Sequence, residues 1–334
     1  MSCKKEIGSE FWSVPESEKT NNLFPESVQW FASGRSALKG ILNELKWAKT
    51  IAVPSWCCDS IIKPITEAGK EIFFYPVLIS DGLHQKIETD CDVLLLIDYF
   101  GFYSEEITKH RCIIIRDITH SVFSTERKDA DYYFGSLRKW CGLWSGGFAW
   151  AKDEHQISTD GSTDKGYFNL RRAAMEKKAE YINNGGKIDD KAEFIQGFIK
   201  AECILDNNIG AAAGAERDIL LINKLDIDTI RCKRRDNANI LLQELQDISL
   251  FRQLNDSDCP LFVPIVPEKD MRDIIHSNLV DNSIYCPKHW PVSEYHRLDD
   301  QTKELYLREI SLICDQRYSE ADMRRIVQVI RKYI

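Results

Sequence analysis

The chain has 334 residues and a formal net charge of −8 at pH 7, with 43% hydrophobic and 29% charged residues. That composition is typical of a soluble globular protein with a large buried core and one to three domains. The negative charge excludes general nucleic-acid binding, which needs a basic surface.

The sequence also lacks an apolar run of about 18 residues, the length that a membrane-spanning helix needs. Its first residues do not contain the apolar core of a secretory signal. We therefore predict a cytoplasmic protein with no membrane partner. The 11 cysteines are odd in number and form no CxxC pair, so we expect free thiols in a reducing compartment and no metal cluster.

Short apolar segments alternate with helical ones between residues 35 and 150. The run Val-Leu-Leu-Leu-Ile at residues 93–97 is apolar on both faces, as expected for a parallel strand covered by helices on each side. The predicted strands are residues 50–53, 71–77, 92–98, 112–116, 132–135 and 147–151. Helical spacing of apolar residues predicts helices over residues 36–47 and 58–68. This half of the chain is predicted to be an α/β domain.

The next stretch, residues 164–245, has a helical and highly charged pattern. Lysines such as Lys178 and Lys191 alternate with acidic residues, and breaks are predicted at residues 185–186 and 207–210. Because a charged helical face is usually solvated, we expect these helices to form an outer layer.

The last part of the chain, from residue 249, mixes strands with helices. The predicted strands are residues 261–266, 283–286 and 310–314, and the predicted helices are residues 270–277, 302–307 and 319–333. This pattern predicts a small α+β domain at the C-terminus.

Three segments that follow or precede these elements carry residues suited to chemistry. In the first, Ser33, Gly34, Arg35 and Ser36 lead into a helix, whose N-terminal N–H groups are able to bind a phosphate. The alternative is a simple N-cap by Ser33.

The second segment places Asp117 at the end of an apolar strand, with His120 three residues later. Ligands of open α/β sheets bind at strand carboxyl ends, and a carboxylate there is able to pair with a protonated pyridine nitrogen. Alternatively, Asp117 caps the next turn, and His120 is a structural histidine.

The third segment, after the first strand, contains Trp56 and Cys58. An aromatic or thiol-bearing turn at this place is able to cover one face of a heteroaromatic ring, although Trp56 is equally suited to the core.

Lys139 lies between an aromatic strand and the pair Gly146 and Gly147 that opens another strand. A lysine amine acts as a nucleophile toward an aldehyde when a scaffold holds it at a cofactor. The alternative is a solvated loop lysine.

Taken together, these segments occur in the order found in fold-type-I pyridoxal-phosphate (PLP) enzymes. The sequence resembles the DegT/StrS-type sugar aminotransferases, with an SG-x-x-AL turn, a VP-aromatic-Cys turn, a strand ending in Asp with His three residues on, and a Ser then Lys followed by Gly-Gly. Residues 310–323 also resemble that family's closing helix and the loop before it. The resemblance covers nearly the whole chain.

The resemblance implies a three-layer α/β/α large domain with a mostly parallel sheet, over residues 1–245, and a small α+β C-terminal domain, over residues 246–334. It implies PLP as the cofactor, a homodimer, and no metal. Lys139 would be the Schiff-base lysine, Asp117 the partner of the pyridine nitrogen, and His120 a neighbour of the ring hydroxyl.

The remaining roles follow from the same resemblance. Residues that would hold the cofactor phosphate are Gly34, Arg35, Ser36 and Ser136. Either Trp56 or Cys58 would cover the ring face.

The sequence departs from the family pattern at two places. The family usually places the serine about five residues before the lysine, whereas Ser136 lies three residues before Lys139. An acidic residue usually precedes the glycine pair, whereas Ser145 precedes Gly146 here.

The predicted activity is transfer of an amino group from an amino acid, glutamate in our interpretation, to a keto sugar. We expect the sugar to be nucleotide-linked and to serve the synthesis of polysaccharide or surface-glycan precursors. The alternatives are a PLP-dependent lyase or dehydratase acting on a sugar, and a catalytically silent scaffold. Related dehydratases replace the lysine, so Lys139 favours transamination. Candidates to bind a diphosphate are Arg138, Lys288 and His289.

Overall fold

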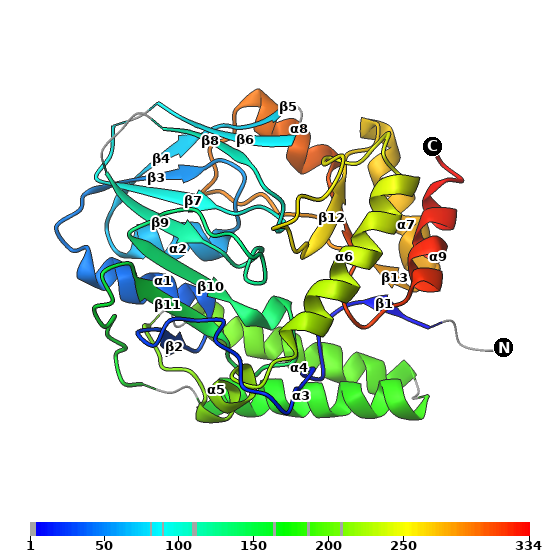
Figure 1. The fold of residues 1–334 in the computed structure, drawn as a ribbon, viewed down its shortest axis with the longest axis horizontal. Helices are drawn as coiled ribbons and strands as arrows, with labels where there is room; N and C mark the ends of the chain where they lie inside the picture. The colour runs from blue at the N-terminus through cyan, green and yellow to red at the C-terminus, as the bar shows by residue number, and fades with distance from the viewer. Residues whose placement is uncertain are drawn as a thin grey trace. The chain divides into compact units, whose positions relative to one another are not determined.

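The computed structural model describes residues 5–80, 82–88, 90–108, 112–162, 165–185, 188–207 and 210–334. These residues fall into two compact units, whose elements are labelled in Figure 1. Unit 1 comprises residues 5–9, 48–130 and 227–334, and unit 2 comprises residues 10–47 and 131–226. Of the predicted breaks, residues 186 and 208–209 lie outside the described residues. The division of the chain into domains at residue 245 stays a prediction.

Unit 1 contains four parallel strands in the order β9, β7, β3, β4. They are β3 (Thr50–Pro54), β4 (Glu71–Tyr75), β7 (Val93–Ile97) and β9 (Ile113–Asp117). Every residue of β7 is buried, which explains why this strand has no polar position. Helix α2 (Asp59–Glu67) connects β3 to β4 and packs on β4. Because the strands are parallel, their carboxyl ends share one edge, where Trp56 follows β3 and Asp117 ends β9.

A second sheet of unit 1 has three strands, β5 (Val77–Ser80), β6 (Gly82–Ile87) and β8 (Glu105–Thr108). The sequence predicted one strand over residues 71–77, but the structure ends β4 at Tyr75 and starts β5 at Val77. Pro76 separates them because it has no N–H for a ladder. Gln85 of β6 is fully buried, and its amide donates to Ile97 O at 3.0 Å while the Tyr75 hydroxyl donates to its Oε1 at 2.9 Å. These bonds satisfy the buried amide.

The C-terminal part of unit 1 combines two strand pairs with helices. Strand β12 (Phe262–Ile265) is antiparallel to β14 (Ile310–Ile313), and β1 (Ile7–Gly8) is parallel to β13 (Ile284–Tyr285). The helical elements are α6 (Ile227–Glu244), η2 (Lys269–Met271), α7 (Arg272–Asp281), α8 (Asp300–Arg308) and α9 (Glu320–Ile330). Helix α9 packs against both α6 and α7.

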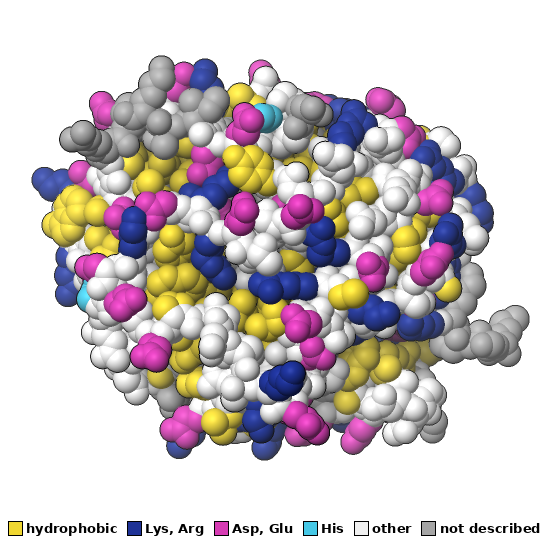
Figure 2. Space-filling model, viewed as in Figure 1, with side chains coloured by type: hydrophobic (Ala, Val, Ile, Leu, Met, Phe, Trp, Pro, Cys, Tyr) yellow, Lys and Arg dark blue, Asp and Glu magenta, His cyan; other side chains and the backbone are white. Residues whose placement is uncertain are grey.

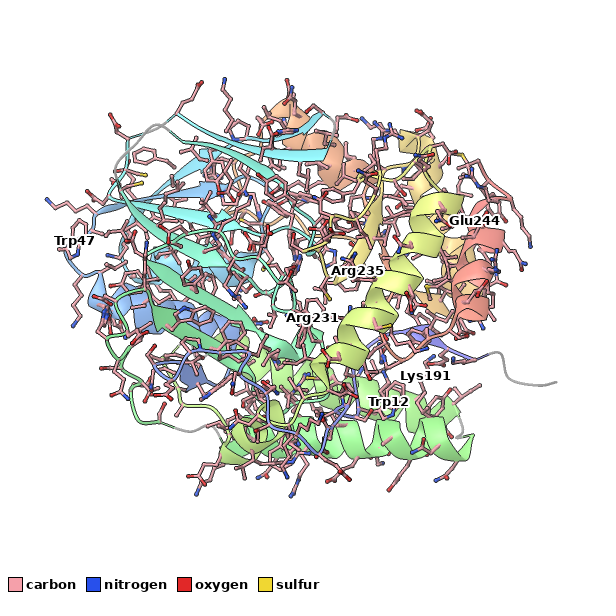
Figure 3. The ribbon with its side chains drawn as sticks, in the orientation of Figure 1. Trp12, Trp47, Lys191, Arg231, Arg235 and Glu244 are labelled. Carbon is pink, nitrogen blue, oxygen red and sulfur yellow. The ribbon has the colours of Figure 1, made fainter. Side chains whose placement is uncertain are left out.

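Helix α6 anchors neighbouring loops through basic side chains, of which Arg231 and Arg235 are labelled with Glu244 in Figure 3. Arg231 Nε donates to Phe123 O at 2.7 Å, and Arg235 donates to three carbonyls between residues 255 and 258. Glu244, the last residue of α6, pairs with Arg324 of α9 at 3.3 Å. A capping box of Ser319 and Asp322 begins α9.

Unit 2 contains an antiparallel hairpin next to a helix. Strand β11 (Gly147–Ala151) pairs with β10 (Tyr132–Ser136) on one side and with β2 (Gln29–Phe31) on the other. The short helix η1 (Leu137–Lys139) lies in the connection, and α1 (Gly34–Glu44) packs on β10 and β11. A Cβ on Gly147 would lie 2.1 Å from Ser33 O. Glycine at this position therefore allows β11 to approach the start of α1.

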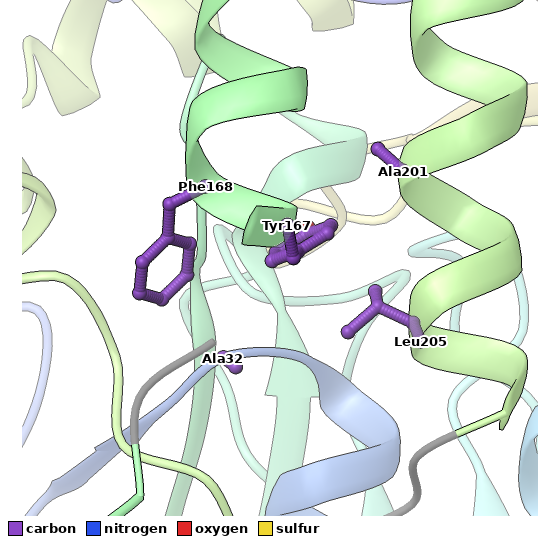
Figure 4. Close-up of a cluster of buried hydrophobic side chains, with 5 residues drawn as sticks. All are labelled: Ala32, Tyr167, Phe168, Ala201 and Leu205. Atoms are coloured by element: carbon purple, nitrogen blue, oxygen red, sulfur yellow. The ribbon is translucent and has the colours of Figure 1, made fainter. Parts of the chain in front are cut away.

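Three further helices complete unit 2. They are α3 (Lys165–Asn184), α4 (Ile188–Asn207) and α5 (Glu216–Ile222). Helices α3 and α4 lie side by side (Figure 1) and bury a cluster of side chains that is drawn in Figure 4. The cluster consists of Ala32, Tyr167, Phe168, Ala201 and Leu205.

The expectation of a solvated charged face is wrong for Lys178. This side chain is 1% exposed, donates to Glu10 O, and lies over the rings of Trp12 at 5.1 Å and Phe194 at 5.8 Å. Its four methylenes pack among apolar groups while the ammonium keeps a carbonyl partner. Arg171, two turns earlier on the same face of α3, is also 1% exposed.

The predicted α/β class is confirmed, and the elements predicted for residues 35–150 are present within a few residues of their expected bounds. On the face in Figure 2, basic and acidic side chains are interspersed with apolar ones. In the described ranges, no helix combines the length and the apolar character that crossing a bilayer requires.

Candidate functional site

Lys139 is the last residue of η1, directly after β10 in unit 2. The loop that follows is closed by a hydrogen bond from Leu137 N to Gly146 O at 2.8 Å. Gly146 has φ +119°, a conformation that glycine adopts without strain. Lys139 is half-buried, so it is not a freely solvated loop lysine.

The N-terminus of α1 lies beside the end of β10. Ser33 is the N-cap, and its Oγ accepts a hydrogen bond from Ser36 N at 3.1 Å. A Cβ on Gly34 would lie 3.5 Å from both Ser136 Cβ and Gly135 O, so the helix end approaches β10 closely. The structure thus brings together Gly34, Ser36 and Ser136, which the sequence predicted to hold a phosphate. It also contains the N-cap by Ser33 that was the alternative interpretation of this segment.

The Ser136 hydroxyl is a buried donor that suits a phosphate. Ser136 is 8% exposed, and within the part of the chain that the structure describes its Oγ has no hydrogen-bond partner. A buried hydroxyl without a partner costs about 1–3 kcal/mol. A phosphate at the N-terminus of α1 would accept this hydrogen bond and would also face the positive end of the helix dipole. The residues present therefore fit the phosphate of PLP.

The side chains of Arg35 and Arg138 are engaged by carboxylates of α4. Arg35 pairs with Asp206 at 2.6 Å and with Glu202 at 3.1 Å, and Arg138 pairs with Glu202 at 2.5 Å. The Arg138 guanidinium also donates to the hydroxyl of Tyr167 at 2.7 Å. Arg35 therefore offers a phosphate its backbone N–H, and Arg138 already has anionic partners before any diphosphate binds.

Glu202 is the centre of this network. Burial opposes ionisation of its carboxyl, but the guanidinium of Arg138, with those of Arg171 and Arg35, outweighs that effect and lowers the pKa of Glu202 to about 2. Burial likewise disfavours the charged form of Arg138, yet the Glu202 carboxylate raises the pKa of Arg138. Arg138, the residue next to Lys139, is therefore held by an ion pair that is charged at neutral pH.

Ser145, which stands where the family pattern has an acidic residue, is bonded to an acid from another element. Asp218 of α5 is 1% exposed and accepts hydrogen bonds from Ser145 N at 2.6 Å and Ser145 Oγ at 2.8 Å. Ser145 Oγ in turn accepts from Ala215 N at 3.0 Å. Sequence reasoning missed Asp218 and Glu202, because both lie in charged helical stretches with no local motif.

Asp117 is the last residue of β9 in unit 1 and is 9% exposed. Its Oδ1 accepts a hydrogen bond from Thr119 N at 2.8 Å. The turn cap that was the alternative is thus present, and it holds the carboxylate at the carboxyl edge of the parallel strands. That edge is where ligands of open α/β sheets bind.

His120 is buried in a group of aromatic rings. Its Nδ1 accepts from Phe100 N at 3.3 Å, so in the neutral ring the proton is on Nε2. The ring stacks on Trp290 with centroids 5.8 Å apart and an interplanar angle of 23°. Trp290 also contacts Trp56, at 5.6 Å. His120 and Trp56 therefore share one aromatic neighbour, Trp290.

Trp56 and Cys58 differ in their surroundings. Trp56 is fully buried, donates from Nε1 to His289 O at 2.8 Å, and stacks on Tyr99 with centroids 5.2 Å apart. Cys58 is half-buried at the N-cap of α2, where its thiol contacts the hydroxyl of Ser60. The Tyr99 ring thus covers one face of Trp56. That either Trp56 or Cys58 covers the cofactor ring stays a prediction.

The two other diphosphate candidates have protein partners. His289 is 8% exposed, its Nδ1 lies 2.7 Å from Ser311 Oγ, and its backbone N–H donates to Glu309 at 2.7 Å. Lys288 pairs with Asp273 at 3.2 Å. His289 is therefore part of a buried polar group of unit 1.

Comparison with known proteins finds relatives by structure and none by sequence. No protein-family model matches the chain, and no curated protein matches it. Solved structures do match: Spr1654 from Streptococcus pneumoniae, a sugar aminotransferase by assignment and solved in its PLP-form, has a TM-score of 0.61 at 14% identity, covering 100% of this chain and 99% of that chain.

The chain has the fold of sugar aminotransferases. PseC from Helicobacter pylori, an aminotransferase involved in the biosynthesis of pseudoaminic acid, matches with a TM-score of 0.59 at 14% identity over 97% of this chain and 99% of that chain. The sugar aminotransferase CalS13 from Micromonospora echinospora matches with a TM-score of 0.58 at 13% identity over 92% of this chain and 87% of that chain. The predicted fold is therefore confirmed over nearly the full length.

Proposed function

We propose that this chain is a PLP-dependent aminotransferase that transfers an amino group from an amino acid to a keto sugar. One observation carries the proposal: the buried hydroxyl of Ser136, which has no hydrogen-bond partner among the described residues, lies beside the N-terminus of α1, and Lys139 follows three residues later. A phosphate cradle next to a lysine is what PLP requires. The shared fold with sugar aminotransferases supports the same conclusion.

In this proposal the predicted residues have distinct roles. Ser136 and the N–H groups of Arg35 and Ser36 bind the phosphate, and Lys139 Nζ holds the cofactor covalently. Asp117 pairs with the pyridine nitrogen, and His120 donates from Nε2 to the ring hydroxyl.

The chemistry follows from these roles. When bound, PLP supplies an electron sink that allows the Cα–H bond of the donor to break. After the donor amine has displaced it from the cofactor, the free Lys139 Nζ would take that proton as general base and return it to a cofactor carbon as general acid. The Asp117 carboxylate keeps the pyridine nitrogen protonated, since an adjacent negative charge favours the protonated form. The hydrogen bond from Thr119 N, at 2.8 Å, holds that carboxylate in place.

The finer parts of the proposal are glutamate as donor, a nucleotide-linked keto sugar as acceptor, a homodimer and a cytoplasmic location. Support for a sugar comes from the structural relatives, two of which, Spr1654 and CalS13, are named as sugar aminotransferases. Support for a role in glycan precursors comes from PseC, which acts in pseudoaminic acid biosynthesis.

The cofactor test uses the purified full-length chain, loaded with PLP and reduced with borohydride. Peptide mapping should find the cofactor on Lys139, and Lys139→Ala should abolish the visible absorbance of bound PLP. A chain that binds no PLP, or a variant with an unchanged spectrum, would refute the proposal.

The reaction test separates transamination from the alternatives. Glutamate should convert the bound cofactor to its pyridoxamine form, and nucleotide keto sugars screened against that form should regenerate the original spectrum. A lyase would release an unsaturated product without needing an amino donor. A silent scaffold would give neither half-reaction.

A further inference from the structure

Cys91 and Cys112 lie at the amino ends of two neighbouring strands of unit 1. Strands β7 and β9 are parallel, with Val93 opposite Ile113. The ladder continues for one more hydrogen bond, which Ile113 N donates to Asp92 O at 3.1 Å. Cys91 directly precedes Asp92, and Cys112 directly precedes Ile113. The backbone therefore brings two cysteines that are distant in sequence to the same end of the sheet.

The two thiols are in contact and share one apolar environment. The Cys112 thiol donates a hydrogen bond to the sulfur of Cys91. Both side chains are half-buried, so a small molecule from solvent is able to reach them. Neighbouring strands with a stagger of one residue place two Cα atoms about 6 Å apart, within the range of about 4.4–6.8 Å that a disulfide spans. Both cysteines pack against one buried cluster, which consists of Ala52, Tyr75, Ile87, Leu94 and Leu96.

The reactivity of Cys91 depends on how readily its thiol ionises. Burial, together with the nearby carboxylates of Asp92 and Asp90, raises the pKa of Cys91 above its ordinary value, although hydrogen bonds from the Ala52 backbone and from Cys112 oppose this rise. The thiol is therefore protonated at neutral pH. Because the thiolate is the reactive form, Cys91 reacts slowly at pH 7 and faster as the pH rises.

We infer that Cys91 and Cys112 are a redox site, which a small disulfide such as oxidised glutathione converts to a reversible disulfide bond. One protein thiolate attacks a sulfur of the oxidant, which gives a mixed disulfide and releases the first small thiol. The neighbouring protein thiol then attacks the protein sulfur of that mixed disulfide and releases the second small thiol. The protein loses two S–H bonds and gains one S–S bond, while the S–S bond of the oxidant is reduced to two S–H bonds.

The bond would fasten β7 to β9 at the edge opposite the one where Asp117 ends β9. Along the strand, Cys112 and Asp117 are roughly 16 Å apart, so the bond does not occupy the carboxyl edge. It closes a loop of roughly 20 residues, which constrains the unfolded chain and lowers the equilibrium constant for unfolding about a hundredfold. Where the surroundings are reducing, the dithiol is the resting form, and the added stability arises only when the thiol pool is oxidised. This role does not depend on the proposed function.

The test uses the purified full-length protein, equilibrated in buffers that differ in the ratio of oxidised to reduced glutathione. Remaining thiols are alkylated, and peptide mapping by mass spectrometry locates each disulfide. Cys91 and Cys112 should become joined to each other as the buffer becomes more oxidising, and dithiothreitol should reverse the link. In urea, the linked protein should have an equilibrium constant for unfolding about a hundredfold lower than the reduced protein. The rate of linking should rise with pH, since the thiolate is the attacking species.

Single substitutions separate the pair from the other thiols. Cys91→Ala and Cys112→Ala should each prevent the link, and the remaining cysteine should hold one glutathione, because no neighbouring thiol displaces it. The matched control is Cys203→Ala, which removes an exposed thiol of α4 and should leave the link unchanged. Each protein is compared in its oxidised and reduced forms, so that any effect of the substitution itself on stability cancels.

Two results would overturn the inference. The first is a wild-type protein in which Cys203 takes up glutathione in the most oxidising buffer, while Cys91 and Cys112 are not joined to each other. The second is a Cys91→Ala protein that oxidation stabilises against urea as much as it stabilises the wild type.

Discussion

Glu202→Gln tests the charge network beside the lysine loop. The substitution keeps the shape of the side chain but removes the charge that pairs with Arg138 at 2.5 Å, Arg35 at 3.1 Å and Arg171 at 3.7 Å. Arg171 is 1% exposed and the Arg138 side chain 13%, so both guanidiniums would keep their desolvation cost without their shared partner.

The size of the effect follows from the pKa of Glu202, which is about 2 in the folded protein against 4.5 ordinarily. That difference corresponds to about 3 kcal/mol of folding free energy, at roughly 1.4 kcal/mol for each pH unit. Because the Glu202 side chain is 34% exposed, solvent screening reduces this to about 2 kcal/mol. We expect Glu202→Gln to lower the free energy of unfolding at pH 7 by about that amount.

The pH dependence gives a second readout. A carboxyl whose pKa is lowered by folding stabilises the protein fully above its unfolded pKa, and this contribution is lost as the pH falls through the folded value. The difference between wild type and Glu202→Gln should therefore be complete above about pH 5 and should shrink toward zero near pH 2.

Urea unfolding followed by circular dichroism, at several pH values, measures both quantities. The matched control is Glu193→Gln on the same helix, whose side chain is 61% exposed and pairs with Lys177. It should cost less than about 0.5 kcal/mol at every pH. The reasoning fails if Glu202→Gln is no more destabilising than this control, or if its effect is as large at pH 2.5 as at pH 7.

Three further substitutions test single groups. Ser136→Ala should raise the Kd for PLP about tenfold. It should leave the Tm of the cofactor-free protein unchanged or higher, because it removes a buried hydroxyl with no partner among the described residues. A fall in that Tm would contradict this expectation. Asp117→Asn should keep the bond from Thr119 N but slow the glutamate half-reaction, followed by absorbance, by about two orders of magnitude; an unchanged rate would count against the pyridine role. Asp218→Asn should reduce unfolding free energy by about 1–3 kcal/mol, measured in urea, since its carboxylate accepts two bonds from Ser145; a neutral result would show that the bonds are not needed.

Local patterns were sufficient for most of the helices and central strands and for part of the candidate site, but they missed the short strands β2, β6 and β8. Apolar runs predicted β7 and β9, and the small residues at Ser33 and Gly34 predicted the start of α1, because these signals depend on neighbours within a few residues. The same holds for Lys139, whose place between β10 and the glycine pair follows from the sequence.

Side-chain partners that are distant in sequence required the tertiary structure. Arg138 and Glu202 are 64 residues apart, Ser145 and Asp218 are 73 apart, and no periodicity within α4 or α5 indicates either pair. The same reason explains Lys178, which has the sequence context of a solvated helix but is buried through contacts with residues 10 and 12.

The sequence by itself determined the main helices and the buried parallel strands, the helix start that suits a phosphate and the lysine that follows it, since backbone preference and apolar spacing are local properties. The tertiary structure decided which charges are neutralised. It joined Arg35 and Arg138 to carboxylates of α4 and left Arg172 without a carboxylate in the described part of the chain, because charge pairing depends on which surfaces the fold brings within about 4 Å.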